Sequence, residues 1–335
     1  MSDNAKLQKV ILPPDVLDLS FGEPVVVMKA LFKQLNCFGN PFKMPNLYDL
    51  PKWTYQPAAG KPDFVGILEE KYGARVVVCN GAKQALAAAL YAFRKAGLKS
   101  CFYDSPYYPA NPSIIESVGL TWADQSSADS FLITSPNNPC GKNLSNIDIT
   151  KWCHKGPVVH DAAYYTEIYL PQDQIPIPLG HIQVFSMSKM YGLSGLRIGY
   201  AVVYDEKYYK DVVDYIETTT AGVSTASQDI ARNIELFFRD NPKYLAEFQR
   251  EAREAIAKSR NLLTLLDPDV LQPEPCDSNS MFAWCKTGPK LNNKAAKVHI
   301  LPGEIFGKPG YMRLNIAYPP EVIAEAIKRL NDNKI

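Results

Sequence analysis

Short apolar runs alternate with helix-forming stretches between about residues 75 and 205, and this alternation restricts the possible folds most. Three β-branched valines at residues 76–78 precede Cys79, a turn follows at Asn80-Gly81, and residues 82–96 are strong helix formers that end at Gly97. Strands that are apolar on both faces and separated by helices indicate a mostly parallel sheet covered by helices. Such sheets bind ligands at the carboxyl ends of their strands.

Composition excludes several classes of protein. The chain carries 36 basic and 35 acidic residues, mixed along 335 positions, so no charge block favours nucleic acid or an anionic membrane. No stretch has the length of a membrane span, and the first residues lack the apolar run of a signal peptide. The seven cysteines include no CxxC pair, which favours reduced thiols and a cytoplasmic location. The four histidines lack ligand spacing, so we expect no metal site.

The segment VFSMSKMYGLSGLRIGY, residues 184–200, concentrates the residue types of a ligand site. Its glycines permit close approach of backbone to a ligand, and the hydroxyls of Ser186 and Ser188 near Arg197 suit a phosphate. Lys189 lies among small and apolar residues and is a candidate for a perturbed amine that forms a Schiff base. A glycine-rich surface loop with ordinary charges is the alternative interpretation.

The spacing in SKxxGLxGxRxG, with Arg197 eight residues after Lys189, resembles the cofactor-lysine segment of the class I/II aminotransferases. These enzymes have the aspartate aminotransferase fold, called fold type I, and use pyridoxal 5′-phosphate (PLP). The resemblance implies that Lys189 holds the cofactor as an aldimine and that Ser186, Ser188 and Arg197 hold its phosphate. It also implies an α/β fold with a mostly parallel central sheet flanked by helices. Residues 36–225 would form the large PLP-binding domain, and residues 1–35 and 226–335 a smaller α+β domain.

Further segments resemble the same family in its chain order. GAKQAL is similar to the phosphate cup, in which backbone N–H groups hold the phosphate, although a strand–turn–helix unit without a ligand has the same pattern. The resemblance implies that SPYYP stacks an aromatic ring on the pyridine ring of PLP and that SPNNPxG donates a hydrogen bond to the cofactor's O3′. It also implies that DxAY supplies a carboxylate for the ring nitrogen and a phenol for O3′. A core aromatic, a plain turn and a helix cap are the respective alternatives. The implied cofactor residues are Gly81, Ala82, Lys83, Tyr108, Asn138, Asp161 and Tyr164, and with Lys189 the last two would be catalytic.

The resemblance also suggests substrate and dimer contacts. Arg313 in RLN would hold the substrate α-carboxylate bidentately, with Asn138 and with Gly22 of FGEP beside it. A solvated arginine and a plain turn are the alternatives. Tyr55 in Y-x-P-x-x-G would reach the neighbouring subunit's phosphate, which implies a homodimer, although it could also be an aromatic at a loop edge. The segment at 287–297 is shorter than in the family.

The activity implied is amino transfer between an L-amino acid and a 2-oxo acid, through a Lys189 aldimine. A PLP-dependent C–S or β-elimination lyase similar to alliinase is an alternative, because SPNNPxG also occurs in that branch. A decarboxylase and a PLP-binding regulator without catalysis are weaker alternatives.

Overall fold

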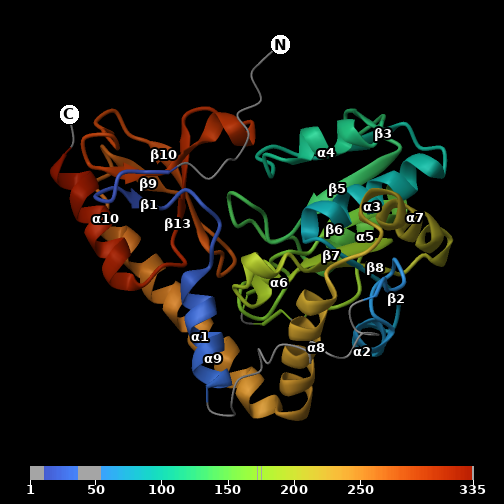
Figure 1. Ribbon diagram of the computed structural model, residues 1–335. Coiled ribbons are helices and arrows are strands. Elements are labelled where there is room, and N and C mark those ends of the chain that lie inside the picture. The colour runs from blue at the N-terminus through green and yellow to red at the C-terminus, as the bar shows by residue number, and fades with distance from the viewer. Residues whose placement is uncertain (1–10, 37–53, 172, 175, 334–335) are drawn as a thin grey trace.

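The computed structural model describes residues 11–36, 54–171, 173–174 and 176–333. Figure 1 shows two lobes, one built on the larger sheet and one that contains β10, β13 and α10, with α6 between them. The helices are α1 (Val25–Leu35), α2 (Pro62–Tyr72), α3 (Ala82–Lys95), α4 (Asn111–Ser117), α5 (Asn146–Lys155), α6 (Met187–Met190), α7 (Tyr209–Thr220), α8 (Thr225–Asp240), α9 (Pro242–Leu262) and α10 (Pro320–Asp332).

The larger sheet has seven strands in the order β2-β8-β7-β6-β5-β3-β4. These strands are β2 (Arg75–Cys79), β3 (Ser100–Phe102), β4 (Thr121–Trp122), β5 (Ser130–Thr134), β6 (Val158–Asp161), β7 (Ile182–Ser186) and β8 (Gly199–Val203). All pairs from β7 to β4 are parallel, whereas β8 runs antiparallel to both β7 and β2. The expected mostly parallel central sheet is therefore confirmed.

Helices cover both faces of this sheet, as its central strands, which are buried on both faces, require. Side chains alternate along β2, so Val76 and Val78 join the core cluster that contains α2 and α8, while Val77 and Cys79 join the cluster that contains α3 and α7. The alanine-rich face of α3 lies against β8, β7 and β6. This close packing places the amino end of α3 at the carboxyl end of the sheet.

The second lobe joins both ends of the described chain. Its four-stranded antiparallel sheet has the order β12-β13-β10-β9, and a parallel pair of short strands lies beside it. The strands are β9 (Leu271–Pro273), β10 (Phe282–Thr287), β12 (Leu301–Pro302), β13 (Tyr311–Asn315), β1 (Leu17–Asp18) and β11 (Val298–His299). α1 packs against α9, and the Asn315 N–H donates to the Leu19 carbonyl at 2.8 Å. The proposed domain limits at residues 35 and 225 stay a prediction.

Two further observations concern the described residues. No helix among them combines the length and hydropathy needed to cross a membrane. α9 ends at Leu262, where the chain tightens into a 3-10 turn, Leu263–Leu265, before Asp267-Pro268. Proline cannot continue a helix, and the residue before a proline avoids the helical conformation.

Candidate active site

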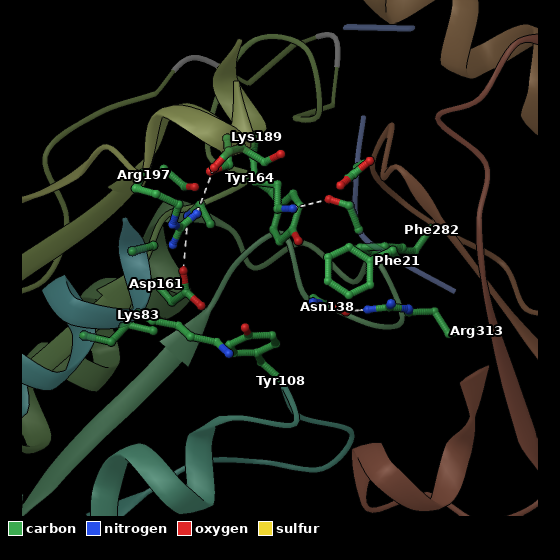
Figure 2. Close-up of a pocket in the computed structure, with 18 residues that line it drawn as sticks. Phe21, Lys83, Tyr108, Asn138, Asp161, Tyr164, Lys189, Arg197, Phe282 and Arg313 are labelled. Atoms are coloured by element: carbon green, nitrogen blue, oxygen red, sulfur yellow. Dashed lines mark hydrogen bonds between the residues drawn. The ribbon is translucent and has the colours of Figure 1, made fainter. Parts of the chain in front are cut away.

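A cavity of about 330 Å³ lies between the two lobes at the carboxyl ends of β5, β6 and β7. Figure 2 shows Asp161, Tyr108 and Lys83 on the side of the larger sheet, with Phe282 and Arg313 of the second lobe opposite. Twelve of the fourteen residues predicted from sequence line this cavity: Gly22, Ala82, Lys83, Tyr108, Asn138, Asp161, Tyr164, Ser186, Ser188, Lys189, Arg197 and Arg313. Segments separated by almost 300 positions are thus brought to one place.

Lys189 lies in the short helix α6, and its side chain extends into the cavity (Figure 2). Its Nζ donates a hydrogen bond to the Gly22 carbonyl, and the Tyr169 hydroxyl donates to the Lys189 carbonyl at 2.8 Å. Burial, together with the positive charge of Arg313, lowers the pKa of Lys189 to about 8. The amine can therefore lose its proton near neutral pH, as a Schiff-base lysine must.

Asp161 is the last residue of β6 and is almost fully buried. One carboxylate oxygen accepts from the Ala163 N–H at 3.2 Å, and the other from the Thr134 hydroxyl at 3.5 Å. Burial raises the pKa of Asp161 to about 6, against these hydrogen bonds and the nearby Lys189 charge, which lower it. In this environment a cationic partner inside the cavity would stabilise the ionised form of the Asp161 carboxylate.

Two tyrosines supply aromatic walls. Burial raises the pKa of Tyr108 to about 12 and that of Tyr164 well above its ordinary value, so both phenols stay protonated. The Tyr164 ring meets the Phe282 ring edge-on, with centroids 5.7 Å apart. The Tyr108 ring has the Lys83 ammonium 5.9 Å from its centroid. The cavity therefore offers flat apolar surfaces with hydroxyl groups at their edges.

The amino end of α3 forms part of an anion-binding site, here called the anion cradle, whose lining residues are Ala82, Lys83, Ser186, Ser188 and Arg197. Gly81 precedes the helix at φ +80°, and a Cβ there would lie 2.5 Å from Nη2 of Arg197. A Cβ on Gly199 would lie 2.6 Å from the Ala82 nitrogen, so the two glycines permit this close packing. The free N–H groups and positive end of the α3 dipole point toward the cavity. Gly81 supports the cradle from behind and does not line the cavity.

Cationic and hydroxyl side chains complete the cradle. Arg197 donates to the carbonyls of Ser194 at 3.0 Å and Asn80 at 3.4 Å, and it has no carboxylate partner among the described residues. Burial lowers the pKa of Lys83, with a smaller contribution from the Arg197 charge. Two cations held close together without a carboxylate, beside buried serine hydroxyls, suit a phosphate dianion.

Arg313 occupies the opposite side of the cavity and is 2% exposed. Its Nη1 donates to Oδ1 of Asn138 at 2.8 Å, and its Nη2 donates to the Ser20 carbonyl. Its guanidinium lies 4.2 Å from the centroid of the Phe282 ring and 4.9 Å from that of Phe306. Burial lowers the pKa of Arg313 to about 10, which leaves it charged at neutral pH. A rigid, desolvated guanidinium is the group that binds a carboxylate bidentately.

Tyr55 does not line the cavity of its own chain. Its side chain is 91% exposed, and its predicted contact with a neighbouring subunit stays a prediction. Six lining residues were not predicted as site residues: Phe21, Glu23, Leu86, Ala163, Ser194 and Phe282. Phe21, Glu23 and Ala163 adjoin a predicted residue in sequence, and Leu86 and Ser194 lie three residues from one, which is a signal that could have found them. Phe282 lies in an apolar strand and carries no such signal.

Comparison with known proteins decides the family. The family described as "Allinase" matches residues 66–241, which is more than half of the chain and includes most of the cavity-lining segments. The chain belongs to the allinase family. Its place in the PLP-dependent fold type I aminotransferase group, expected from the sequence, is thereby confirmed.

Individual relatives extend this assignment. The chain is 35% identical over 167 residues to tryptophan aminotransferase-related protein 2 of Arabidopsis thaliana. The aligned part covers 46% of this chain and 36% of that protein. This allinase-family chain thus spans about a third of the length of that relative. It is 26% identical over 336 residues to a probable aspartate/prephenate aminotransferase of Aquifex aeolicus, with 83% of each chain covered. A double mutant of Thermus thermophilus aspartate aminotransferase has the same fold, with a TM-score of 0.75, 21% identity, and 95% and 91% of the two chains covered.

The cofactor of this allinase-family protein is PLP, and the cavity fits it. The anion cradle matches the charge of the phosphate, and the walls from Tyr108 and Ala163 suit a flat ring. Asp161 could supply a buried carboxylate for a ring N–H, and Lys189 could supply the amine for the aldehyde. Each polar group of the cofactor therefore has a chemically matched side chain in one cavity.

Proposed function

We propose that this allinase-family protein is an aminotransferase that moves an amino group between an L-amino acid and a 2-oxo acid. The observation that carries the proposal is the placement of Lys189, Asp161 and Arg313 around one cavity. A buried amine with a lowered pKa, a buried carboxylate and a fixed guanidinium are the three groups that a PLP-dependent reaction of an amino acid needs.

When bound, PLP supplies an aldehyde that takes up the amino group and a ring that withdraws electrons from the substrate Cα. The Asp161 carboxylate, ionised above about pH 6, would keep a proton on the ring nitrogen. The Lys189 amine, with a pKa of about 8, accepts the proton that leaves the substrate Cα and returns it later in the reaction. Tyr164, which stays protonated, would donate a hydrogen bond from its hydroxyl group to the ring oxygen.

Arg313 positions the substrate. Its guanidinium is held between the Phe282 and Phe306 rings and by Asn138, so a carboxylate bound to it meets a fixed donor pair. Fixing the carboxylate restricts rotation of the substrate and aims the Cα–H bond at Nζ of Lys189. The buried Nε of Arg313 makes no hydrogen bond to the described residues, so this guanidinium keeps donor capacity.

We further propose that the amino donor carries a neutral or aromatic side chain. Among the described lining residues the cations are Lys83, Lys189, Arg197 and Arg313, and each already has a role above. No lining cation then remains for a second substrate carboxylate. Phe21 and Phe282 instead offer apolar surface beside Arg313. The relative named as a tryptophan aminotransferase-related protein supports an aromatic donor.

Half-reactions with the PLP-loaded protein test this function. L-Phenylalanine, L-alanine and L-aspartate, each mixed in turn with the protein, should bleach the visible absorbance of the bound cofactor and release one 2-oxo acid per site, with L-aspartate slowest. Lys189→Ala should lose both signals, because no side-chain amine then reacts with the aldehyde. Lys151→Ala, an exposed lysine paired with Asp148, is the matched control and should behave as the parent. Full activity in Lys189→Ala would contradict the proposal.

β-Elimination is the second candidate, favoured by the description of the family as Allinase. Elimination needs a leaving group on the substrate Cβ but uses the same proton acceptor, Lys189. S-Alkyl cysteine sulfoxides separate the two reactions. Steady release of pyruvate and ammonia without a 2-oxo acid co-substrate identifies a lyase, whereas a single half-reaction that stops identifies a transferase.

We also propose a homodimer in which Tyr55 completes the neighbouring site. The exposure of Tyr55 and its position just before α2, outside its own cavity, support this arrangement. The cytoplasmic location expected from the cysteine pattern stays a prediction.

A further inference from the structure

Two cysteines lie where the lobes meet, at the edge of the active-site cavity. Cys140 belongs to residues 137–141, here called the asparagine turn, which follow β5 and include the cavity residue Asn138. Cys276 belongs to the second lobe and lies between β9 and β10. Its thiol donates to the Gly141 carbonyl at 3.6 Å, and a Cβ on Gly141 would lie 2.5 Å from its sulfur. The Cys276 sulfur therefore lies against the residue that follows Cys140.

Hydrogen bonds hold this contact between the lobes in place. The Ser278 hydroxyl donates to the Gly141 carbonyl at 2.6 Å, and the Asn143 N–H donates to the Asp277 carboxylate at 2.8 Å. Within the asparagine turn, the Gly141 N–H donates to the Asn137 carbonyl at 2.9 Å. The two segments that carry the thiols are thus fixed relative to one another.

The Cys140 thiol is close enough to Cys276 for the two to interact. Burial, together with the nearby Cys276 thiol, raises the pKa of Cys140 to about 11, against hydrogen bonds from backbone N–H groups. The Cys140 thiol donates to Oδ1 of Asn137 at 3.1 Å, and both cysteines are half-buried. Rotation about the Cα–Cβ bond of Cys140 would exchange this hydrogen bond for contact with the other sulfur.

Arg260 of α9 gives Cys276 a cationic neighbour. Its Nη2 donates to the carbonyls of Ser280 and Phe282, which are both neutral acceptors, and its buried Nε makes no hydrogen bond to the described residues. Burial lowers the pKa of Arg260, whereas the charges of ionised Cys276 and Cys285 raise it. The same interaction stabilises a Cys276 thiolate, and a partly exposed thiol near a cation is the kind that reacts with oxidants.

The remaining described cysteines are less suited to such chemistry. Cys79, Cys101 and Cys285 are buried, and burial raises the pKa of each thiol. Cys153, on α5, is half-buried, and burial raises its pKa as well. A buried, protonated thiol is a poor nucleophile, so oxidation should be selective for the pair at the lobe contact.

We propose that Cys140 and Cys276 are a redox-sensitive pair, which hydroperoxides oxidise to a disulfide between the two lobes. The Cys276 thiolate attacks one oxygen of hydrogen peroxide, the O–O bond breaks, and the departing hydroxide takes up a proton and leaves as water. The Cys140 sulfur then attacks the resulting sulfenic acid, forms the S–S bond and releases the hydroxyl group as a second water. The two thiols lose two electrons and two protons in total, and one peroxide is reduced to two waters.

The bond would join the asparagine turn to the second lobe beside Arg313. Asn138 of this turn already accepts from Arg313 at 2.8 Å. A disulfide closes the chain from residue 140 to residue 276 and would therefore limit separation of the lobes at this edge of the cavity. Its formation needs only the two thiols and a peroxide, so the proposal stands or falls independently of the proposed amino transfer.

Mass spectrometry tests the bond directly. The PLP-loaded full-length chain is reduced, freed of reductant, treated with hydrogen peroxide, alkylated and digested. Peptides linked through Cys140 and Cys276 should appear, should vanish on treatment with dithiothreitol, and should be absent from Cys276→Ser or, if that variant fails to fold, from Cys276→Ala. Cys153→Ser, which removes a half-buried cysteine on α5, is the matched control and should form the bond as the parent does. No linked peptides, or Cys276 linked to a different cysteine or to a second chain, would overturn the proposal.

Two further measurements test the order of the steps and the restraint. In Cys140→Ser the sulfenic acid has no second thiol to react with, so dimedone should label Cys276; label on a different cysteine would overturn its assignment as the peroxide-reactive thiol. The oxidised parent should unfold at a higher urea concentration than the reduced parent, because the bond closes a long loop. Cys276→Ser should unfold at the same concentration in both conditions. Equal midpoints for the oxidised and reduced parent would overturn the restraint of the lobes.

Discussion

Replacement of Arg313 by lysine gives the sharpest test of how the substrate is held. In the structure, two guanidinium nitrogens of Arg313 donate in fixed directions, and the group is sandwiched between Phe282 and Phe306. Lysine keeps a positive charge but replaces the planar fork by a single ammonium. It therefore cannot offer a carboxylate two parallel hydrogen bonds.

The magnitude follows from the lost hydrogen bond. A hydrogen bond to a charged group contributes about 1.5–3 kcal/mol, so Arg313→Lys should lower kcat/KM for an amino acid by about 10- to 150-fold. Burial already lowers the pKa of the arginine to about 10. The ordinary pKa of lysine is lower, so the same burial would remove part of its charge at neutral pH and would add to the loss.

A pair of substrates isolates the effect. L-Phenylalanine and phenethylamine differ only in the carboxylate, and stopped-flow absorbance of the bound cofactor follows the reaction of each. Arg313→Lys should slow L-phenylalanine by the factor above and should change phenethylamine less than about threefold. The exposed Arg250, paired with Glu247 and Glu254, supplies the control Arg250→Lys. An equal loss for both amines, or loss of the cofactor absorbance itself, would refute carboxylate binding by Arg313.

Three other predictions follow from the site. Burial raises the pKa of Asp161 from 3.8 to about 6, so its ionisation costs the cofactor-free fold about 3 kcal/mol as the pH rises through this range. Asp161→Asn should therefore resist urea better than the parent at pH 7, with the advantage shrinking towards pH 4; a constant difference would contradict this origin. Gly81→Ala should weaken PLP more than pyridoxal, which lacks the phosphate, because the new Cβ meets Arg197 at 2.5 Å. Gly97→Ala, also at positive φ but facing open space, controls for strain alone. Sedimentation should give twice the 37.4 kDa chain mass, and Tyr55→Phe should weaken PLP about tenfold, whereas a monomer with unchanged affinity would exclude the shared site.

The central sheet and most of the cavity could be predicted because their signals are local in sequence. A short apolar run that ends in a polar residue indicates both a buried strand and its carboxyl end, and Asp161 ends such a run. Glycines also mark two parts of the site: Gly81 at the start of α3, where a Cβ would meet the Arg197 side chain, and Gly192 after Lys189, where a Cβ would meet Met28.

Other features depend on contacts that the sequence does not display. Phe282 and Phe306 occupy ordinary apolar positions, and only the fold places their rings against Arg313. Tyr72, Tyr191 and Tyr204 occupy ordinary positions in the sequence, and only the fold places them around a second cavity of about 540 Å³. The role of Tyr55 depends on a second chain, which a single sequence cannot position.

The segment Leu19–Glu23 is held in place by β13, the last strand of the second lobe. Asn315 donates its N–H to the Leu19 carbonyl and its side-chain amide to the carbonyls of Phe21 and Glu23, and Lys189 then donates to Gly22. During synthesis on the ribosome this segment emerges some 290 residues before its partner strand. The pocket for the vitamin-derived cofactor can therefore be completed only after β13 has emerged, although the larger sheet can form before that. Until then the segment has no partner strand, and the nascent chain exposes it to chaperones.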